Sequence, residues 1–168
     1  MTKNAEYWIK KLDLLPHPEG GYYKETYRSP ESISVKNLPS RYHKDHCFCT
    51  AIYFLLNGRQ YSAFHRINSD ELWYFHAGSP LKLYSIDKDG MLFEIKLGPH
   101  LERGEIFQAH LRQGCWFAAE VIDKEYYSLV SCTVAPGFEF DDFELADATE
   151  LIAQFPRHKN LISRLCAG

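Results

Sequence analysis

The chain has 168 residues and a formal net charge of −3, and 45% of its residues are hydrophobic. That length and apolar content suit a single domain covering 1–168, with no Pro/Gly/Ser-rich linker to divide it. No run of Lys or Arg forms a basic stripe, so neither nucleic acid nor an anionic membrane is an expected partner. The sequence shows no signal-peptide core and no apolar run long enough to span a bilayer, so a cytoplasmic protein is expected.

The first part of the chain predicts one helix followed by strands. Asn4, a residue type favoured at the N-cap, precedes apolar side chains at helical spacing. These are Ala5, Trp8, Ile9 and Leu12. From Tyr22 onward, short runs rich in aromatic and β-branched residues alternate with turns such as Asn57-Gly58. Strands are expected at 22–27, 49–56, 61–67, 72–76, 81–86, 92–97, 106–111, 116–120 and 127–134.

The C-terminal part predicts a return to helix. Asp147 with Glu150 resembles a capping box, and Pro156 ends the helix that follows it. Apolar residues at 161, 162 and 165 indicate one more short turn of helix. Many short strands at even spacing, flanked by helices at both ends, predict an all-β antiparallel sandwich or jelly-roll barrel.

Four segments together resemble one family of the cupin superfamily, the small uncharacterised proteins called cupin family five, a domain of unknown function. The segments are 15–23, 62–75, 114–119 and 128–140. The most specific parts are the His-Pro-Glu-Gly-Gly-Tyr run at 17–22 and the Pro-Gly-Phe-Glu-Phe run at 136–140. The resemblance covers nearly the whole chain. It implies a double-stranded β-helix, the cupin jelly-roll barrel, with one cavity, frequent homodimers and kinship with sugar-nucleotide epimerases that work without metal.

The stretch from Gly58 to Gly78 resembles the first cupin motif. In that motif, two histidines two residues apart and a glutamate four residues later point into the barrel. His65 and Glu71 match it, but Ile67 stands in the place of the second histidine. Residues 65 and 67 share a strand face, so an aliphatic side chain occupies a position where an imidazole would ligate. The resemblance therefore implies a retained pocket with weakened metal binding.

The second cupin motif is altered in the same way. Phe117, in the stretch 114–117, stands where the motif has its last histidine. His65 and Glu71 are then two of four usual ligands, too few for tight binding of a transition metal. No cofactor is expected. The alternative is a divalent metal held by His65 and Glu71 with Gln108, or with His110, one strand earlier.

His65 and Glu71 are the predicted catalytic pair. A histidine of near-neutral pKa beside a carboxylate can act as a general base. Tyr53 or Tyr23 is predicted to return the proton from the opposite face, which would give isomerisation or epimerisation. The alternative is that His65 and Glu71 only hydrogen-bond to each other inside the barrel, without any chemistry.

Ligand-binding residues follow from parity along the strands. Trp73 and Phe75 share the face of Glu71, so their rings should line the interior and suit a cyclic ligand, although such stripes are more often core. In the 136–144 run, Phe138 should face inward and Phe143 away; the alternative there is a solvated acidic face. The predicted binding residues are Glu19, Glu25, Ser62, Trp73, Phe75, Phe117, Phe138 and Phe140.

The segment that follows residues 20 and 21 is predicted to close one side of the pocket. Its two glycines can pass close to another backbone, and Tyr23, Glu25 and Tyr27 share a strand face. Arg28 is available either for an anionic ligand group or for surface carboxylates. The alternative is an ordinary edge strand whose glycines only turn the chain.

Together these features predict a cytoplasmic cupin whose pocket binds a sugar-like or carboxylate-bearing small molecule. The predicted activity is that of a metal-independent isomerase or epimerase with His65 as general base. Three alternatives stay open: a non-catalytic binding protein, a metal-dependent cupin enzyme, and a partner-binding dimer with a vestigial pocket. The expected partners are the small molecule and a second copy of the chain in a homodimer.

Overall fold

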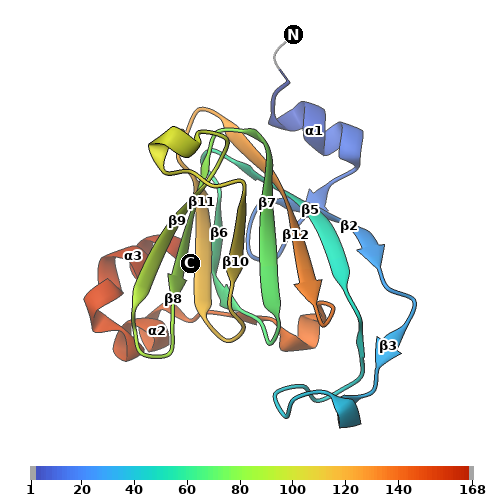
Figure 1. Ribbon diagram of the computed structural model, residues 1–168. Coiled ribbons are helices and arrows are strands. Elements are labelled where there is room, and N and C mark those ends of the chain that lie inside the picture. Colours follow the sequence, from blue (N-terminus) through green and yellow to red (C-terminus); the bar gives the residue numbers. More distant parts are fainter. Residues whose placement is uncertain (1–2, 167–168) are drawn as a thin grey trace.

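The computed structural model describes residues 3–166 and contains two antiparallel sheets packed face to face (Figure 1). The six-stranded sheet has the order β1-β2-β5-β12-β7-β10, and the five-stranded sheet has the order β13-β6-β11-β8-β9. The first comprises β1 Leu15–Pro16, β2 Tyr22–Arg28, β5 Thr50–Asn57, β12 Tyr127–Ala135, β7 Asp70–Gly78 and β10 Gln108–Leu111. The second comprises β13 Glu144–Leu145, β6 Tyr61–Arg66, β11 Trp116–Val121, β8 Leu81–Ile86 and β9 Leu92–Leu97.

The interior between the sheets is built by alternate residues of each strand. On β5, Phe54 and Leu56 face inward and are almost fully buried, while Leu55 packs on the outer side. Leu83 of β8 and Phe117 of β11 belong to the same interior cluster as Phe54, so both sheets contribute to one core. This alternation is the period of two expected for strands with one buried face.

The helices cover the outer faces of the two sheets, as Figure 1 shows. Helix α1 (Ala5–Leu12) starts at Asn4, whose side chain accepts a hydrogen bond from the Tyr7 N–H at 3.0 Å, and packs on the six-stranded sheet. Helices α2 (Ala148–Gln154) and α3 (Lys159–Leu165) pack on the five-stranded sheet, beside Trp116. The predicted all-β core with flanking helices is confirmed.

Two connecting segments meet at one end of the sandwich. An arm of residues 29–49 carries the short pair β3 (Ser32–Ile33) and β4 (His46–Cys47) and a 3-10 turn, Val35–Asn37, and it projects from the barrel in Figure 1. Residues 136–143, which we call the strap, lead from β12 in one sheet to β13 in the other and contain the 3-10 turn Phe140–Asp142. The strap therefore crosses between the sheets at this end.

The nine predicted strands are present with local differences, whereas the two-residue strands β1, β3, β4 and β13 were not predicted. Strand β7 is longer at both ends than the expected 72–76, and β10 starts two residues later than the expected 106. A register shift in the β2–β5 pairing lies between Glu25 and Tyr27, so Tyr27 does not share the face of Glu25. The two remaining 3-10 turns, Leu101–Arg103 and Pro156–His158, lie before β10 and before α3.

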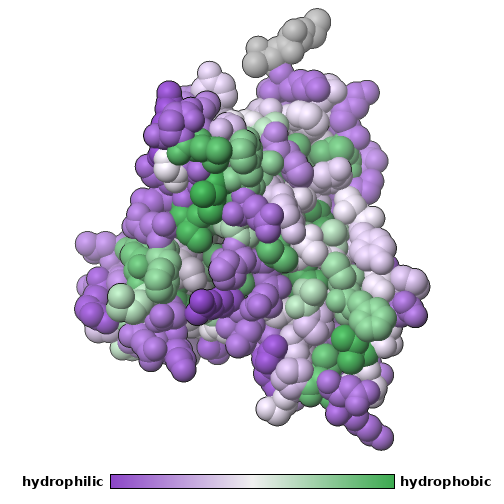
Figure 2. All heavy atoms as spheres, in the orientation of Figure 1, coloured by the Kyte–Doolittle hydropathy of each residue, from purple (hydrophilic) through white to green (hydrophobic). Residues whose placement is uncertain are grey.

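On the face shown in Figure 2, polar side chains surround places where apolar side chains gather. Around β9 and β10 the large apolar residues Phe93, Ile106 and Phe107 are exposed. Within residues 3–166, no helix has the length and apolar character needed to cross a membrane. The homodimer expected from the sequence stays a prediction.

Candidate functional site

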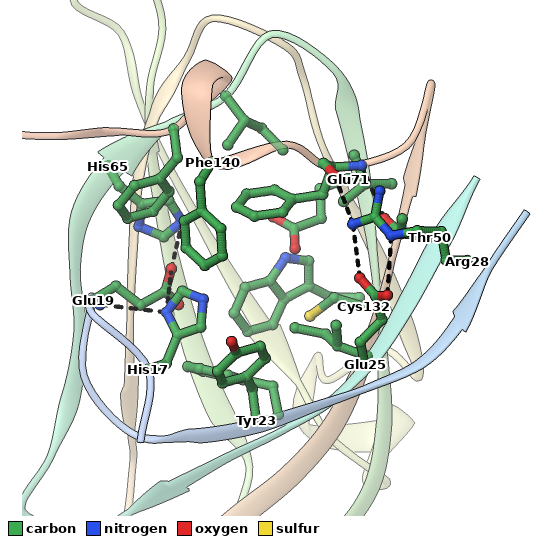
Figure 3. A pocket seen from close by; sticks show the side chains of 17 residues that line it. His17, Glu19, Tyr23, Glu25, Arg28, Thr50, His65, Glu71, Cys132 and Phe140 are labelled. Atoms are coloured by element: carbon green, nitrogen blue, oxygen red, sulfur yellow. Dashed lines mark hydrogen bonds and ion pairs between the residues drawn. The ribbon is translucent and has the colours of Figure 1, made fainter. Parts of the chain in front are cut away.

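A cavity of about 270 Å³ lies between the two sheets, beside the strap. Its walls come from β2, β5, β7 and β12 of the six-stranded sheet, from β6 of the other sheet, from the loop at 17–19, and from the strap. Figure 3 shows His17, Glu19 and His65 together on one side of the cavity, and Arg28 with Glu25 on the other. The volume lies near the lower end of the range for small-molecule pockets, about 300–1,000 Å³, which suits a ligand no larger than a single sugar ring.

On the first side, His65 of β6 forms a buried dyad with Glu19. Its Nδ1 lies 2.7 Å from the carbonyl oxygen of Ala63, which can only accept, so Nδ1 carries a hydrogen. Its Nε2 lies 3.1 Å from Oε2 of Glu19. Oε1 of the same carboxyl accepts a hydrogen bond from the Ser62 hydroxyl at 2.8 Å. One further proton must therefore lie between Nε2 and Oε2.

Burial decides where that proton resides. Burial lowers the pKa of His65 to about 4, although the hydrogen bond to Ala63 acts in the opposite direction. Burial also raises the pKa of Glu19, against the effects of His17 and Ser62. Both shifts favour the uncharged form of the pair, in which the Glu19 carboxyl keeps the proton and donates it to Nε2 of an uncharged imidazole.

The loop that carries Glu19 approaches β6 closely because two glycines follow it. Gly20 has a φ of +109°, and a Cβ there would lie 2.2 Å from the carbonyl oxygen of Tyr61. Gly21 has a φ of +75°, and its Cβ would lie 2.7 Å from the carbonyl oxygen of Leu55. Only glycine accepts both the conformation and the contact. The two glycines therefore set the position from which Glu19 reaches His65.

His17 extends the dyad on the same side. Its Nδ1 lies 3.5 Å from Oε2 of Glu19 and accepts a hydrogen bond of 3.3 Å from the Glu19 backbone N–H. Burial lowers its pKa; Glu19 acts against this shift, and His65 adds to it. Because Nδ1 is an acceptor, a neutral His17 carries its hydrogen on Nε2.

Glu71 of β7 is a second buried carboxyl in the cavity. Burial is the main cause that raises its pKa to about 8; a negative charge on the nearby Glu19 acts in the same direction, and the Trp73 indole and Cys132 thiol act in the opposite direction. At neutral pH Glu71 is therefore mostly a neutral acid that can donate a hydrogen bond. The Trp73 indole nitrogen, although near Glu71, has no hydrogen-bond partner of normal geometry among residues 3–166. Its N–H lies at the cavity wall, where it still acts on the Glu71 carboxyl.

The other side of the cavity is charged. Arg28 forms a two-point ion pair with Glu25, with Nε–Oε1 at 3.0 Å and Nη2–Oε2 at 2.9 Å. Its Nη1 also lies 2.7 Å from Oε1 of Glu139 in the strap. The hydrogen bonds and charges of Glu25 and Glu139 raise the pKa of the guanidinium. Arg28 is the one Lys or Arg side chain among the described residues that line this cavity.

The predicted pairing of His65 with Glu71 is wrong. Both side chains line the cavity, as expected, but no hydrogen bond or ion pair joins them in the described part of the chain. Glu19 is the partner of His65, because the glycine loop brings it against β6. The near-neutral pKa expected for His65 is also wrong, because the side chain is only 3% exposed and burial disfavours its charged form.

Of the two tyrosines predicted to return a proton, only Tyr23 lines the cavity. The prediction for Tyr53 is wrong. Tyr53 alternates with the inward-facing Ile52 and Phe54 of β5 and therefore points outward. Its side chain packs in the cluster under α1, with its ring 6.0 Å from that of His76 on the outer face of the sheet.

Four other predicted residues do not line the cavity. Ser62 is buried and donates a hydrogen bond to Glu19 instead, so it contacts the dyad without lining the cavity. Phe75 packs against the interior cluster further along β7, and the Phe117 ring fills the space against His65, with ring centroids 4.1 Å apart. Gln108 is exposed on the edge strand β10, because it alternates with Ala109 and Leu111, which face the interior cluster.

The remaining predicted binding residues do line the cavity: Glu19, Glu25, Trp73, Phe138 and Phe140. Phe143 was expected to face away from them but lines the cavity too, because a 3-10 turn replaces the regular strand in the strap. Tyr27 was expected to share the face of Glu25. The register shift in β2 places Arg28 there instead. Contact of any of these residues with a ligand stays a prediction.

No functional role was predicted for His17, Thr50 or Cys132, all of which line the cavity. His17 stands at the head of the His-Pro-Glu-Gly-Gly-Tyr run, so the specificity of that run was the available signal. Cys132 shares the inward face of β12 with Val130 and Val134, which indicates a buried face and nothing more. Burial raises its thiol pKa, so it is not a thiolate at neutral pH.

Comparison with known proteins identifies the family. A family model described as cupin superfamily (DUF985) matches residues 6–146. The chain belongs to this cupin family. A hypothetical protein from Leishmania major is 36% identical, with a TM-score of 0.90 over 99% of this chain and 100% of its own. Protein SO0799 from Shewanella oneidensis is 40% identical, with a TM-score of 0.88 over 99% of each chain.

Two other known proteins are similar to the chain, one in sequence and one in fold. An uncharacterised protein of Saccharomyces cerevisiae, YML079W, is 28% identical over 148 residues, which is 80% of this chain and 71% of its own. Oxalate decarboxylase from Bacillus subtilis has a TM-score of 0.54 at 16% identity, over 89% of this cupin and 36% of the enzyme. This cupin therefore spans about a third of that enzyme, and the likeness concerns the fold alone.

Cupins commonly hold a divalent metal, and the donor set of this cupin does not fit one. Nδ1 of His65 donates to Ala63, and Nε2 faces the Glu19 carboxyl. Two motif positions carry Ile67 and Phe117, which have no donor atoms. Across residues 3–166, no three or more His, Cys, Asp or Glu side chains are grouped so that they could hold a metal ion.

Proposed function

We propose that this cupin binds a small carbonyl compound in the cavity and moves a proton within it, as an isomerase or epimerase does. The His65–Glu19 dyad acts as the base, and Glu71 acts as the acid. Tyr23 lines the same cavity and is available to orient the ligand. This assignment keeps the base predicted from the sequence and replaces its partner and the proton donor.

The observation that carries the proposal is the opposite displacement of two pKa values in one cavity. The pKa of His65 is lowered to about 4, so the imidazole is uncharged at neutral pH and its Nε2 can accept the proton of Glu19 during the reaction. The pKa of Glu71 is raised to about 8, so the carboxyl retains a proton to give. Pairs of titratable groups shifted apart in this way are typical of acid–base catalysis.

The proposed step conserves atoms and charge. A C–H bond beside the substrate carbonyl breaks and its proton goes to the Glu19 carboxyl, whose own proton moves to Nε2 of His65. The electron pair stays in the substrate as an enol double bond, and the carbonyl oxygen takes the proton of Glu71. Reversal at the neighbouring carbon, or on the other face of the same carbon, restores both groups.

Solvent exchange tests the proposal. In D₂O, D-glucose, D-fructose, D-glyceraldehyde and dihydroxyacetone are incubated with the protein, and NMR follows loss of the C–H signal beside each carbonyl. We expect enzyme-dependent exchange with at least one of them. Both His65→Ala and Glu71→Gln should slow it by about 100-fold or more, because general acid–base groups contribute about 10²–10⁴-fold.

A matched control separates chemistry from folding. Tyr53→Phe removes a hydroxyl from the same barrel but on the outer face of β5, so the exchange rate should not change. Equal loss of exchange in Tyr53→Phe and His65→Ala would contradict the proposal.

Binding without turnover is the second candidate, and one observation favours it. An imidazole whose pKa is about 4 is a weak base, and both nitrogens of His65 already have partners. If a sugar binds in the cavity but no carbonyl compound exchanges its proton, this cupin is a binding protein and the dyad is structural.

A further inference from the structure

We infer that the cavity selects an uncharged ligand, and that Arg28, held by Glu25 and Glu139, is the residue that determines this selectivity. The inference rests on the proposed function only in placing the ligand in this cavity. It narrows the ligand from the sugar-like or carboxylate-bearing class to neutral molecules that carry hydroxyl or carbonyl groups.

Arg28 has no N–H left for a ligand. A guanidinium has five N–H donors. Nε donates to Glu25 at 3.0 Å, and Nη2 donates both to Glu25 at 2.9 Å and to the carbonyl oxygen of Phe138 at 3.1 Å. Nη1 donates to Glu139 at 2.7 Å and contacts the sulfur of Cys47 at 3.7 Å. An anionic ligand could pair with Arg28 only by displacing one of these partners.

The balance of charge at the cavity also opposes an anion. Arg28 and Lys44 carry two positive charges, and the three carboxylates that pair with them, Glu25, Glu139 and Asp141, carry three negative charges. The His65–Glu19 dyad holds one shared proton and is neutral as a pair. A ligand carboxylate would therefore leave water for a site with a net negative charge and no unpaired cation, which is costly in a buried setting.

The remaining groups suit a neutral ligand. The Trp73 indole N–H lies at the cavity wall beside the Glu71 carboxyl, in a side chain that is 1% exposed. Tyr23 brings a hydroxyl to the cavity, and Glu71 brings a carboxyl. The rings of Phe138 and Phe143 line the cavity as well. Hydroxyl and carbonyl groups can pair with such neutral donors, while flat rings pack against the apolar face of a sugar.

Binding of a matched pair of sugars tests the inference. D-glucose and D-glucuronate share the same ring and differ in charge. Affinity is measured by ligand-observed NMR and by titration of the tryptophan fluorescence. We expect the protein to bind glucose at least 10-fold more tightly than glucuronate. Glu25→Gln releases N–H groups of Arg28 and removes one negative charge, so it should reduce this preference at least 10-fold. Glu139→Gln should act in the same direction and serves if Glu25→Gln does not fold.

Glu144→Gln is the matched control. Glu144 follows the strap at the start of β13, and its carboxylate pairs with Arg66 at 2.7 Å, outside the network of Arg28, Glu25 and Glu139. Its loss removes the same charge without releasing Arg28, so the preference should change less than 2-fold. Wild-type protein that binds glucuronate as tightly as glucose, or an unchanged preference in both glutamine variants, overturns the inference.

A second pair, benzyl alcohol and benzoate, extends the test beyond sugars. If neither of the neutral molecules, glucose and benzyl alcohol, binds, the inference is also overturned. Proton exchange is a separate readout. Selective binding of the neutral ligand without exchange contradicts the proposed catalysis and leaves the selectivity standing.

Discussion

The two sides of the cavity use the same residue type in opposite ways. On one side, the Glu19 side chain is 7% exposed and faces a histidine that is 3% exposed. On the other side, the Glu25 and Arg28 side chains are each 39% exposed and form an ion pair. Burial raises the pKa of Glu19, whereas exposure to water leaves the second pair charged. The difference teaches that solvent access decides whether a glutamate here holds a proton or a cation.

The two sides also differ in how they are held in place. Glu19 depends on a backbone approach that only glycines permit, and the Ala63 N–H donates to the Glu19 carbonyl oxygen at 2.8 Å. Arg28 depends on side-chain contacts to Glu25 and to the strap. We therefore expect the dyad to fail when the backbone is disturbed, and the charged side to respond to charge and salt.

The largest expected effect comes from Gly20→Ala. The added Cβ would clash with the Tyr61 carbonyl oxygen, and the φ of +109° would strain any residue other than glycine. The costs of strain, of a forced shift of the loop and of lost hydrogen bonds therefore combine. We expect a loss of about 5 kcal/mol in the free energy of unfolding, measured with denaturant. Gly114→Ala is the control: its φ is +73° with no atom within 4 Å, so it should cost only about 1–2 kcal/mol. Equal costs would contradict the role given to the loop.

Glu71→Gln should show an intermediate effect that depends on pH. The pKa of Glu71 is about 8 in the folded protein, raised from an ordinary value of 4.5. Between these values the folded state binds the proton more tightly, so the stability that Glu71 contributes is lost as pH rises toward 8. Glutamine does not titrate. The variant should therefore gain stability relative to the wild type by about 3 kcal/mol from pH 4 to pH 7.

Thermal or denaturant unfolding at a series of pH values measures this difference. Parallel stability curves for the two proteins would show that Glu71 is charged at neutral pH. The proposed acid would then be lost, while the geometry of the dyad would be unaffected.

Much of the fold could be predicted because local signals agreed with it. Asn4 and Asp147 cap their helices, and the alternation of apolar and polar residues matches the strands of the sheets. The resemblance to cupins predicted the jelly-roll barrel. His65 and Glu71 were placed in the interior by parity alone, and both line the cavity.

The partner of His65 could not be predicted because it comes from a loop rather than a strand. Parity predicts which side chains share a face within one strand, and Glu19 reaches His65 across 45 intervening residues of sequence. Irregular backbone caused the other errors: the register shift in β2 exchanged Tyr27 for Arg28, and the 3-10 turn in the strap turned Phe143 inward. Such departures depend on tertiary packing, which a period of two does not contain.

The smallest effect on the free energy of unfolding is expected from Glu19→Gln and Glu25→Gln. Comparing these two variants separates the two sides of the cavity most directly. A glutamine at 19 can donate its N–H to Nε2 of His65 and still accept from Ser62, as the protonated carboxyl does. It should therefore cost less than about 1 kcal/mol of unfolding free energy, with no dependence on salt. Glu25→Gln removes a half-exposed ion pair, so its similar cost should shrink as salt screens the charges. A large, salt-sensitive loss in Glu19→Gln would mean that the dyad is a carboxylate with an imidazolium, and the neutral side of the cavity would then be as ionic as the other.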